Sequence, residues 1–173
     1  RPAPFTPERL DAGLRAAAAL VNGCSQLFAG WVRGFERHAN ELPLFDPKLS
    51  LGAGGDPNIT YYHSYWRLAQ GEALLIEVTP PPCEAWHFQL DNWWMESLDY
   101  RVHRIHVNKH TARYQPDGSV RIAVAHQDPG PRHPNWIETA GHRHGTMCFR
   151  WIGAKEHPQP RTRVVRLAEL RGR

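Results

Sequence analysis

Hydrophobic residues recur every three or four positions in the first part of the chain, and this spacing predicts an amphipathic helix from Pro7 to about Glu36. Thr6 can cap that helix and Pro7 suits its first position. The apolar stripe, which we expect to pack against the rest of the protein, consists of Leu10, Leu14, Ala17, Val21, Cys24, Phe28, Trp31 and Phe35. Gly23 and Gly30 weaken the helix, so two shorter helices fit the pattern equally well.

Beyond Asp56 the pattern changes to short extended runs that are separated by turn residues. The predicted strands are Thr60 to Leu68, Ala73 to Thr79, Trp86 to Asn92, Tyr100 to Val107, Thr111 to Tyr114, Ser119 to His126, Thr146 to Ile152 and Arg163 to Leu167. Asp117-Gly118 is the clearest hairpin turn. The pattern predicts a mainly β protein: an antiparallel β-sandwich of about eight strands (46–173), with an N-terminal α-helical segment (1–45) packed on it.

Successive side chains of a strand point to opposite faces, which assigns residues to the core or to the outside. The apolar sets are Trp86, Phe88 and Leu90 on one strand and Met147, Phe149 and Trp151 on another. The opposite sets are His87, Gln89 and Asp91 on the first strand and Cys148 and Arg150 on the second. The polar residues opposite the apolar faces therefore line a cavity or face solvent, and the sequence does not decide between these two interpretations.

Composition narrows the class of protein. The 173 residues fit one domain, and a hydrophobic fraction of 41% is ordinary for a globular chain. The net charge of +4 is scattered, which favours solubility over nucleic-acid binding. The three cysteines have no Cys-x-x-Cys spacing, so a reducing, cytoplasmic location is expected. No apolar run approaches the roughly 20 residues that cross a membrane.

The densest polar chemistry lies on two predicted loops near the C-terminus. One runs from His126 to Gly130 and the other from Asn135 to Gly145, and both carry turn-forming glycines or prolines. Loops held by strands often carry binding or catalytic residues, so we predict a site here. Trp94 and Trp136, each beside polar turn residues, are expected to face a ligand.

A metal site is one hypothesis for these loops. His142 and His144 stand two residues apart, so both rings project to the same side of an extended segment, and His126 or Asp128 could add a third ligand. In the alternative, His144 is exposed and His142 only hydrogen-bonds a neighbouring loop. No dinucleotide fingerprint, phosphate loop or Gly-x-Ser-x-Gly elbow is present, so the sequence names no cofactor.

Several short motifs resemble the domain of unknown function 1214 (DUF1214) family, in their order along the chain. They are Gly55-Asp56-Pro57-Asn58 with Tyr61-Tyr62, Gly71 to Leu74, Trp94 to Tyr100, Asp128-Pro129-Gly130, Asn135 to His142 and Arg150-Trp151. The motif residues are Asp128, Asn135, Trp136, Thr139, Gly141, His142 and Arg150, with Trp94, Ser97 and Asp99 in the preceding loop. The resemblance implies a jelly-roll β-sandwich, often found at the C-terminus of longer bacterial proteins, with no agreed activity.

Two classes of function follow from these residues. In the first, the domain binds or transforms a small organic ligand: His142 exchanges a proton, Asp128 orients it, Arg150 holds an anionic group, and the two tryptophans grip the ligand body. The further binding candidates are Asn135, Glu96 and His126.

In the second class, the same loops are structural and the domain serves as a homo-oligomerisation module. Asp128 and Asn135 then close the long loop, and Arg150 pairs with Glu138 or Asp99. The loop that contains Glu96, Ser97 and Asp99 allows the same two hypotheses. Its side chains supply an acid or a nucleophile, or they only close the loop through hydrogen bonds.

Overall fold

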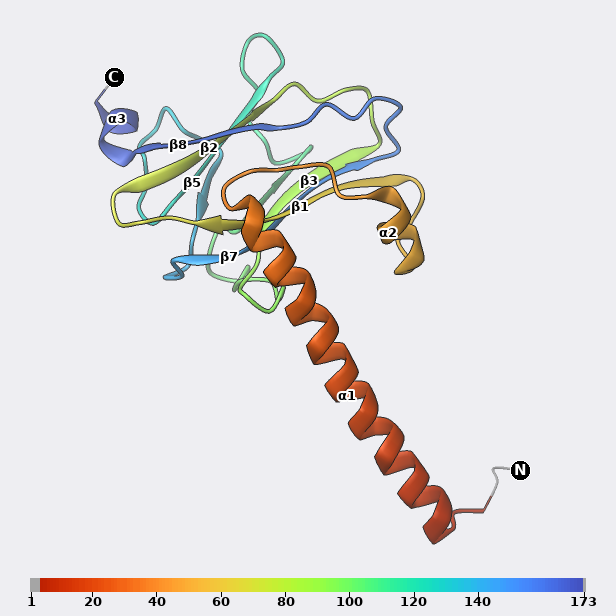
Figure 1. Ribbon diagram of the computed structural model, residues 1–173. Helices are drawn as coiled ribbons and strands as arrows, with labels where there is room; N and C mark the ends of the chain where they lie inside the picture. The colour runs from red at the N-terminus through yellow and green to blue at the C-terminus, as the bar shows by residue number, and fades with distance from the viewer. Residues whose placement is uncertain (1–3, 173) are drawn as a thin grey trace.

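The computed structural model describes residues 4–172 and contains two β-sheets and a long N-terminal helix (Figure 1). The helices are α1 (Pro7–Phe35), the 3-10 turn η1 (Glu36–His38), α2 (Pro47–Gly52) and α3 (Leu167–Arg171). The strands are β1 (Ile59–Arg67), β2 (Glu72–Val78), β3 (Ala85–Leu90), β4 (His106–Asn108), β5 (Val120–Ala125), β6 (Trp136–Glu138), β7 (His144–Ile152) and β8 (Arg161–Arg166). Among residues 4–172, no helix combines the length and the apolar character needed to span a bilayer.

Helix α1 begins and ends close to the predicted bounds. The Thr6 side chain accepts a hydrogen bond from the Arg9 amide at 3.4 Å, as a cap does, and Pro7 occupies the first turn. The helix is continuous for 29 residues, through Gly23 and Gly30, so the single-helix prediction is confirmed.

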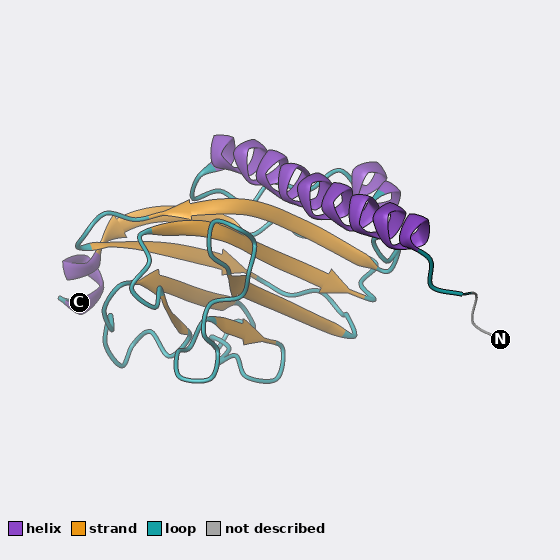
Figure 2. Cartoon of the chain, turned by 90° about the horizontal axis from the view of Figure 1, so that it is seen from below, coloured by secondary structure: helices purple, strands orange, loops and turns teal. Residues whose placement is uncertain are grey.

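The apolar stripe of α1 does not pack along its length, and that expectation is wrong for the described residues. Only Ala29, Val32 and Phe35 are buried, whereas Leu14 is 61% exposed and Val21 67% exposed. Figure 1 gives the reason, because α1 runs away from the sheets and only its C-terminal end lies beside β1. Seen from below, the helix lies on one side of the layered strands (Figure 2).

The strands form two four-stranded sheets. Sheet A has the order β1-β7-β3-β4 and sheet B the order β6-β5-β2-β8. All pairs are antiparallel except β5 and β6, which are parallel, so the wholly antiparallel prediction needs this correction.

The main core combines residues of both sheets. Trp86 and Phe149 of sheet A stack at 5.6 Å between ring centroids, and Leu74 and Ile122 of sheet B belong to the same buried cluster. The apolar faces expected from the period of two are therefore confirmed on β3 and β7. The alternate residues of these strands point to the outer face of sheet A.

Several boundaries differ from the prediction. The run from Tyr100 to Val107 is mostly loop, with only His106–Asn108 in a strand, and 111–114 contributes a single bridge at Tyr114. The Asp117-Gly118 turn is present, with Gly118 at a φ of 78°. Strand β6 and the short helices α2 and α3 were not predicted, because three to six residues carry too little periodicity to be recognised.

The segment after α1 follows β1 and covers its free edge. The Asn40 amide donates to the Tyr65 carbonyl at 2.8 Å, and the Phe45 amide donates to the Tyr61 carbonyl at 2.9 Å. Asn40 adopts a positive φ of 66°, which turns the chain out of η1 and along the strand. This path places Phe45 over the outer face of sheet A.

Gly145 of β7 packs closely against β1 and the segment that follows β3. A Cβ atom there would overlap the Asp91 carbonyl oxygen and lie 3.0 Å from Trp66 Nε1. We expect Gly145→Ala to lower the free energy of unfolding by about 3 kcal/mol, because buried backbone must move to make room. Urea denaturation measures this loss.

Gly23→Ala on α1 is the matched control, because nothing lies within 4 Å of its added methyl group. It should leave stability unchanged or raise it by up to about 1 kcal/mol through helix propensity. Equal losses in both variants would contradict the close approach at Gly145.

Candidate functional site

The outer face of sheet A carries rows of polar and aromatic side chains. The strand register places Arg150 of β7 between Tyr61 of β1 and His87 of β3. The next row is His63, Cys148 and Gln89, and the third contains Tyr65, Thr146 and, on β3's continuation, Asp91. Residues that lie far apart in the sequence therefore form one surface.

Arg150 is the centre of this surface. Its side chain is half-buried, and its Nε atom donates to Cys148 Sγ at 3.4 Å. The guanidinium carbon lies 5.8 Å from the centroid of the Tyr61 ring. Within residues 4–172, Arg150 forms no ion pair with a carboxylate, so the predicted pairs with Glu138 and Asp99 are wrong.

His63 lies among aromatic rings beside the arginine. Its ring stacks on Phe35 at 5.5 Å and on Tyr61 at 5.3 Å, and the edge of Phe45 approaches at 5.3 Å. Burial, with a smaller effect of the Arg150 charge, lowers the pKa of His63 to about 4. His63 is therefore a neutral hydrogen-bonding group at pH 7.

His87 occupies the other side of the arginine. Burial first, and then the charges of Arg150 and His106, lower its pKa to about 4. The His106 ring lies 5.7 Å away, and the buried Nδ1 atom of His87 has no hydrogen-bond partner among the described residues. An unsatisfied buried nitrogen is a place where a ligand or a water molecule can bind.

Asp91 and Cys148 complete the cluster, and burial raises the pKa of both groups. Burial raises the pKa of Asp91 to about 6, and Gln89 Nε2 donates to its Oδ1 at 2.5 Å. Burial also raises the pKa of the Cys148 thiol to about 11, so the group is not a thiolate at neutral pH. Arg150 is thus the one cation in the centre of this face, and Asp91 is an anion at pH 7 that forms no ion pair with it among the described residues.

A pocket of about 230 Å³ opens beside these residues, between the end of α1, the α2 loop and β1. Its lining is mainly aromatic and apolar: Trp31, Phe35, Phe45, Tyr61, His63 and Met95, with Ser50 and residues 53–55 at the rim. Tyr61 lines this pocket, and its ring also lies beside the Arg150 guanidinium.

The structure does not bring the predicted catalytic residues together. Arg150 lies six residues along β7 from His144, about 20 Å at the usual strand rise. Asp128 accepts a hydrogen bond from the Gly130 amide at 2.7 Å and is exposed, and His142 is exposed on the loop before β7. Asp128 therefore closes its own turn, as the structural alternative expects.

Trp94 and the two loop histidines share a different hollow. It measures about 450 Å³ and is lined by Asn92, Trp93, Trp94 and residues 141–144. Trp94 is 55% exposed, and His144 Nδ1 lies 2.6 Å from the Tyr65 hydroxyl. This surface contains three of the predicted site residues, Trp94, His142 and His144, but no Asp or Glu lines it.

The predicted third metal ligands lie elsewhere in the loops. His126 is held by the Thr139 hydroxyl at 2.8 Å and the Leu68 carbonyl at 3.1 Å. In the part of the chain that the structure describes, no group of three His, Cys, Asp or Glu residues is placed to hold a metal ion. A site built on His142 and His144 lacks the third protein ligand that the hypothesis requires.

Other predicted binding residues hold the loops closed. Asn135 is buried, accepts from the Arg113 amide at 2.7 Å and donates to the carbonyls of Arg113 and Arg121. Trp136 Nε1 donates to the Ala125 carbonyl at 3.1 Å, and Glu96 Oε2 accepts from the Asn92 amide group at 2.7 Å. These contacts are those of structural residues.

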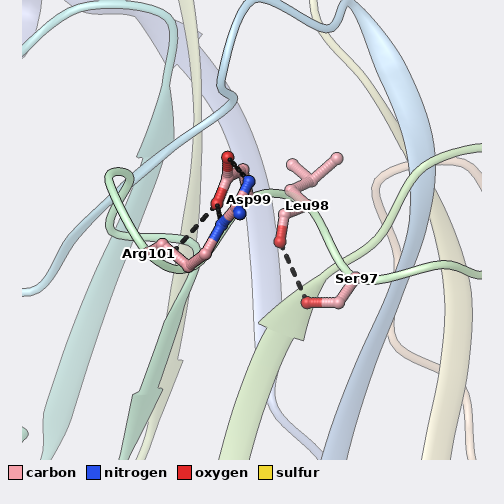
Figure 3. Close-up of polar contacts among 4 residues, drawn as sticks. All are labelled: Ser97, Leu98, Asp99 and Arg101. Carbon is pink, nitrogen blue, oxygen red and sulfur yellow. Dashed lines mark hydrogen bonds and ion pairs between the residues drawn. The ribbon is translucent and has the colours of Figure 1, made fainter.

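The loop that follows Trp94 closes on itself in the same way (Figure 3). Arg101 folds back on Asp99 with distances of 2.8 and 2.9 Å, and Ser97 donates to the Leu98 carbonyl at 3.0 Å. The hydrogen bonds from Arg101 lower the pKa of Asp99 to about 2. The hydrogen bonds of Ser97 and Arg101 stay within the loop, so loop closure describes these residues best.

Sequence reasoning named Arg150 and His87 for one possible cavity, gave Tyr61 only as part of a motif, and did not assign His63 or His106 to the site. The period of two places Tyr61 and His63 opposite the core side of β1, which was a usable signal. The pairing of β1 with β7 was not visible in the sequence, because these strands are about 85 residues apart.

Comparison with known proteins gives structural relatives only. No protein-family model matches the sequence, and neither does a curated protein. The crystal structure of an uncharacterized protein from Burkholderia cenocepacia is 54% identical over 98% of this chain, with a TM-score of 0.92. The VPA0106 protein from Vibrio parahaemolyticus is 18% identical over 95% of the chain, with a TM-score of 0.54, and it shares the fold alone. The chain spans about half the length of each, 47% in both cases.

The lowered pKa of His63 predicts a pH dependence of stability. Between pH 6.5 and about 4 the unfolded chain binds a proton at His63 that the native protein does not, so the free energy of unfolding falls as the pH falls through this window. The variant His63→Gln lacks this contribution and should lose less stability over the same window.

Urea unfolding near pH 7 and pH 4.5 measures the difference, and the His63 ring resonance should titrate near pH 4 by NMR. A titration near pH 6.5, or equal losses in both proteins, would show that the His63 ring is not desolvated.

Proposed function

We propose that this chain binds a small organic carboxylate on the outer face of sheet A. The observation that carries the proposal is the half-buried Arg150 guanidinium, which has no carboxylate partner among the described residues. A guanidinium in such surroundings is electrostatically incomplete, and a carboxylate can satisfy it with two parallel hydrogen bonds.

The neighbouring groups favour an anion with an apolar body. Tyr61 borders both Arg150 and the aromatic pocket, so a ligand that lies along Tyr61 could place its charge at the arginine and its apolar part against Phe35, Phe45 and Met95. A volume of about 230 Å³ suits a compact ring or a branched chain. His63 and His87, both neutral at pH 7, can direct the ligand without competing for its charge.

The proposal is for binding and includes no reaction. The Cys148 thiol, whose pKa burial raises to about 11, is a poor nucleophile at neutral pH. Asp91, with a pKa of about 6, could exchange a proton, but its first partner is Gln89. Geometry therefore supports recognition more directly than catalysis.

We further propose, from the sequence motifs, that the chain is a jelly-roll domain of the DUF1214 family. Its two sheets and the longer Burkholderia cenocepacia relative support this assignment, because the family domain is expected within larger bacterial proteins. In this view the chain is the ligand-binding half of a longer protein.

Benzoate is the probe for the carboxylate site, and neutral benzamide has the same shape without the charge. We expect benzoate to bind more tightly than benzamide, and Arg150→Gln to weaken benzoate binding by roughly tenfold or more while changing benzamide little. Isothermal titration calorimetry or NMR shift titration measures both affinities.

Arg163→Gln is the control, because Arg163 is an exposed arginine on β8 of the other sheet. It should keep full benzoate affinity. Equal binding of the two probes to the unaltered protein, or benzoate binding that survives Arg150→Gln, would overturn the proposal.

A further inference from the structure

We propose that the outer face of sheet B carries a binding site for a small molecule with a phosphomonoester group. The site is a hollow of about 500 Å³ that residues of β5, β2, β8 and α3 line, on the other sheet from Arg150. Figure 1 shows these three strands beside one another, with α3 at the end of β8. The lining includes three arginines, Arg121, Arg132 and Arg163.

The strand register directs two of these arginines to the outer face. On β2, Leu74 belongs to the core, so Leu75 and Glu77 point outward. Arg163 of β8 pairs with Leu75 and Arg121 of β5 pairs with Glu77, so both arginines share that face. Their backbones lie on either side of β2, about 12 Å apart when the offset of two residues is included. The two long side chains can therefore approach one ligand above Leu75 from two sides.

The loop between β5 and β6 supplies the third side of the hollow through Arg132 and His133. The His133 amide donates to the Gly130 carbonyl at 3.0 Å, and Arg171 of α3 donates to the Asp128 carbonyl at 2.7 Å. These bonds hold the loop in shape and tie it to α3. Guanidinium groups therefore reach one hollow from three separate elements, which are β5, this loop and β8.

Most of the positive charge in the hollow is not neutralised within the described chain. Arg132 and Arg163 form no ion pair among residues 4–172, and Arg132 makes one long hydrogen bond, of 3.4 Å, to a backbone carbonyl. Arg121 pairs through its Nε atom with Glu77 at 2.6 Å. Glu169 also lines the hollow, but it forms no ion pair with the arginines in this part of the chain.

The charges of the hollow and of the row beside it add up to those of a dianion's partner. Glu77 lies in register between Arg121 and Arg161, so arginines flank this carboxylate on both sides. The four arginines at positions 121, 132, 161 and 163 and the two glutamates at 77 and 169 leave a net charge of +2. An anion with two charges would balance this face.

A phosphomonoester fits this arrangement better than a carboxylate does. It carries close to two negative charges at pH 7, and its three terminal oxygens accept hydrogen bonds. Because these oxygens point in different directions, one phosphate group can accept from arginines on three sides. A carboxylate has two oxygens in one plane and suits a single guanidinium, such as that of Arg150.

His133 adds a polar atom whose hydrogen bonding is incomplete. Its buried Nδ1 atom has no hydrogen-bond partner among the described residues. Burial first, and then the charges of Arg121 and Arg132, lower the pKa of His133, against a backbone hydrogen bond with Leu170 that raises it. The ring is therefore neutral at pH 7 and can form a hydrogen bond with a ligand hydroxyl group or a water molecule.

The limited extent of the basic surface favours a small molecule over a nucleic acid. The volume of the hollow lies in the range of small-molecule sites, and Leu75 and Leu170 give it an apolar part. A nucleic acid strand needs cations along several successive phosphates. The neighbouring hollow, which shares Arg121, also contains Asp117 and Glu77, so acidic groups interrupt the positive surface there.

Glycerol 3-phosphate is the probe, and dimethyl phosphate, a diester with one negative charge, is the comparison. We expect glycerol 3-phosphate to bind roughly tenfold more tightly than dimethyl phosphate. Arg163→Gln and Arg132→Gln should each weaken its binding by roughly fivefold or more. Isothermal titration calorimetry at low ionic strength measures the affinities. By NMR, the Arg163 Nε–H signal should shift during the titration and the Arg150 signal should not.

Arg166→Gln is the matched control. It removes the same charge from β8, but Arg166 is three residues from Arg163, on the opposite face of the strand, and does not line the hollow. It should keep the glycerol 3-phosphate affinity within about twofold, and so should Arg150→Gln. Because Arg163→Gln should in turn keep the benzoate affinity, a failure of either site can be recognised separately. Circular dichroism checks that the variants remain folded.

Three results would overturn the proposal. The first is a lack of saturable glycerol 3-phosphate binding to the unaltered protein. The second is an equal loss of affinity in Arg163→Gln and Arg166→Gln, which would reflect overall charge and not a site. The third is weak binding of glycerol 3-phosphate together with tight, salt-dependent binding of an oligothymidylate of about 20 nucleotides, which would assign the arginines to nucleic acid.

Discussion

Strand β7 must satisfy two different environments, and the rest of the structure depends on this constraint. It lies between β1 and β3, so its inward residues Phe149 and Trp151 fill the core while its outward residues Cys148 and Arg150 cross the middle of the opposite face. A central strand cannot move a side chain aside into solvent as an edge strand can. The charge of Arg150 is therefore fixed on a surface that α1 and Phe45 partly cover.

Holding a cation in such a place costs free energy unless an anion accompanies it. Other proteins often supply a carboxylate from the same chain, but here the acid on this face, Asp91, is hydrogen-bonded to Gln89 and forms no ion pair with Arg150 among the described residues. Two histidines, His63 and His87, remain neutral beside the arginine because burial and its charge lower their pKa values. Among the described residues the Arg150 charge has no ion-pair partner, and a ligand carboxylate would provide one.

Local sequence patterns predicted much of the fold because hydrophobic periodicity reports directly on helices and on half-buried strands. They placed α1, its cap at Thr6 and the faces of β3 and β7. They could not show which strands pair, so the surface formed by Tyr61 and Arg150 was not assembled. The loop residues were predicted to form the site because they are polar and close in sequence. In the structure, Asn135 and similar residues form hydrogen bonds that close the loops. The stripe on α1 was expected to meet the sandwich, since periodicity shows that a face is apolar and not what covers it.

The most direct test of the central claim is the NMR signal of the Arg150 side-chain Nε–H group during a titration with benzoate. If a carboxylate completes the site, this signal should shift and saturate with the same affinity as the bulk binding curve, while the Arg163 signal stays in place. If benzoate binds and the Arg150 signal does not move, the guanidinium is not the anion-binding group and the account is wrong.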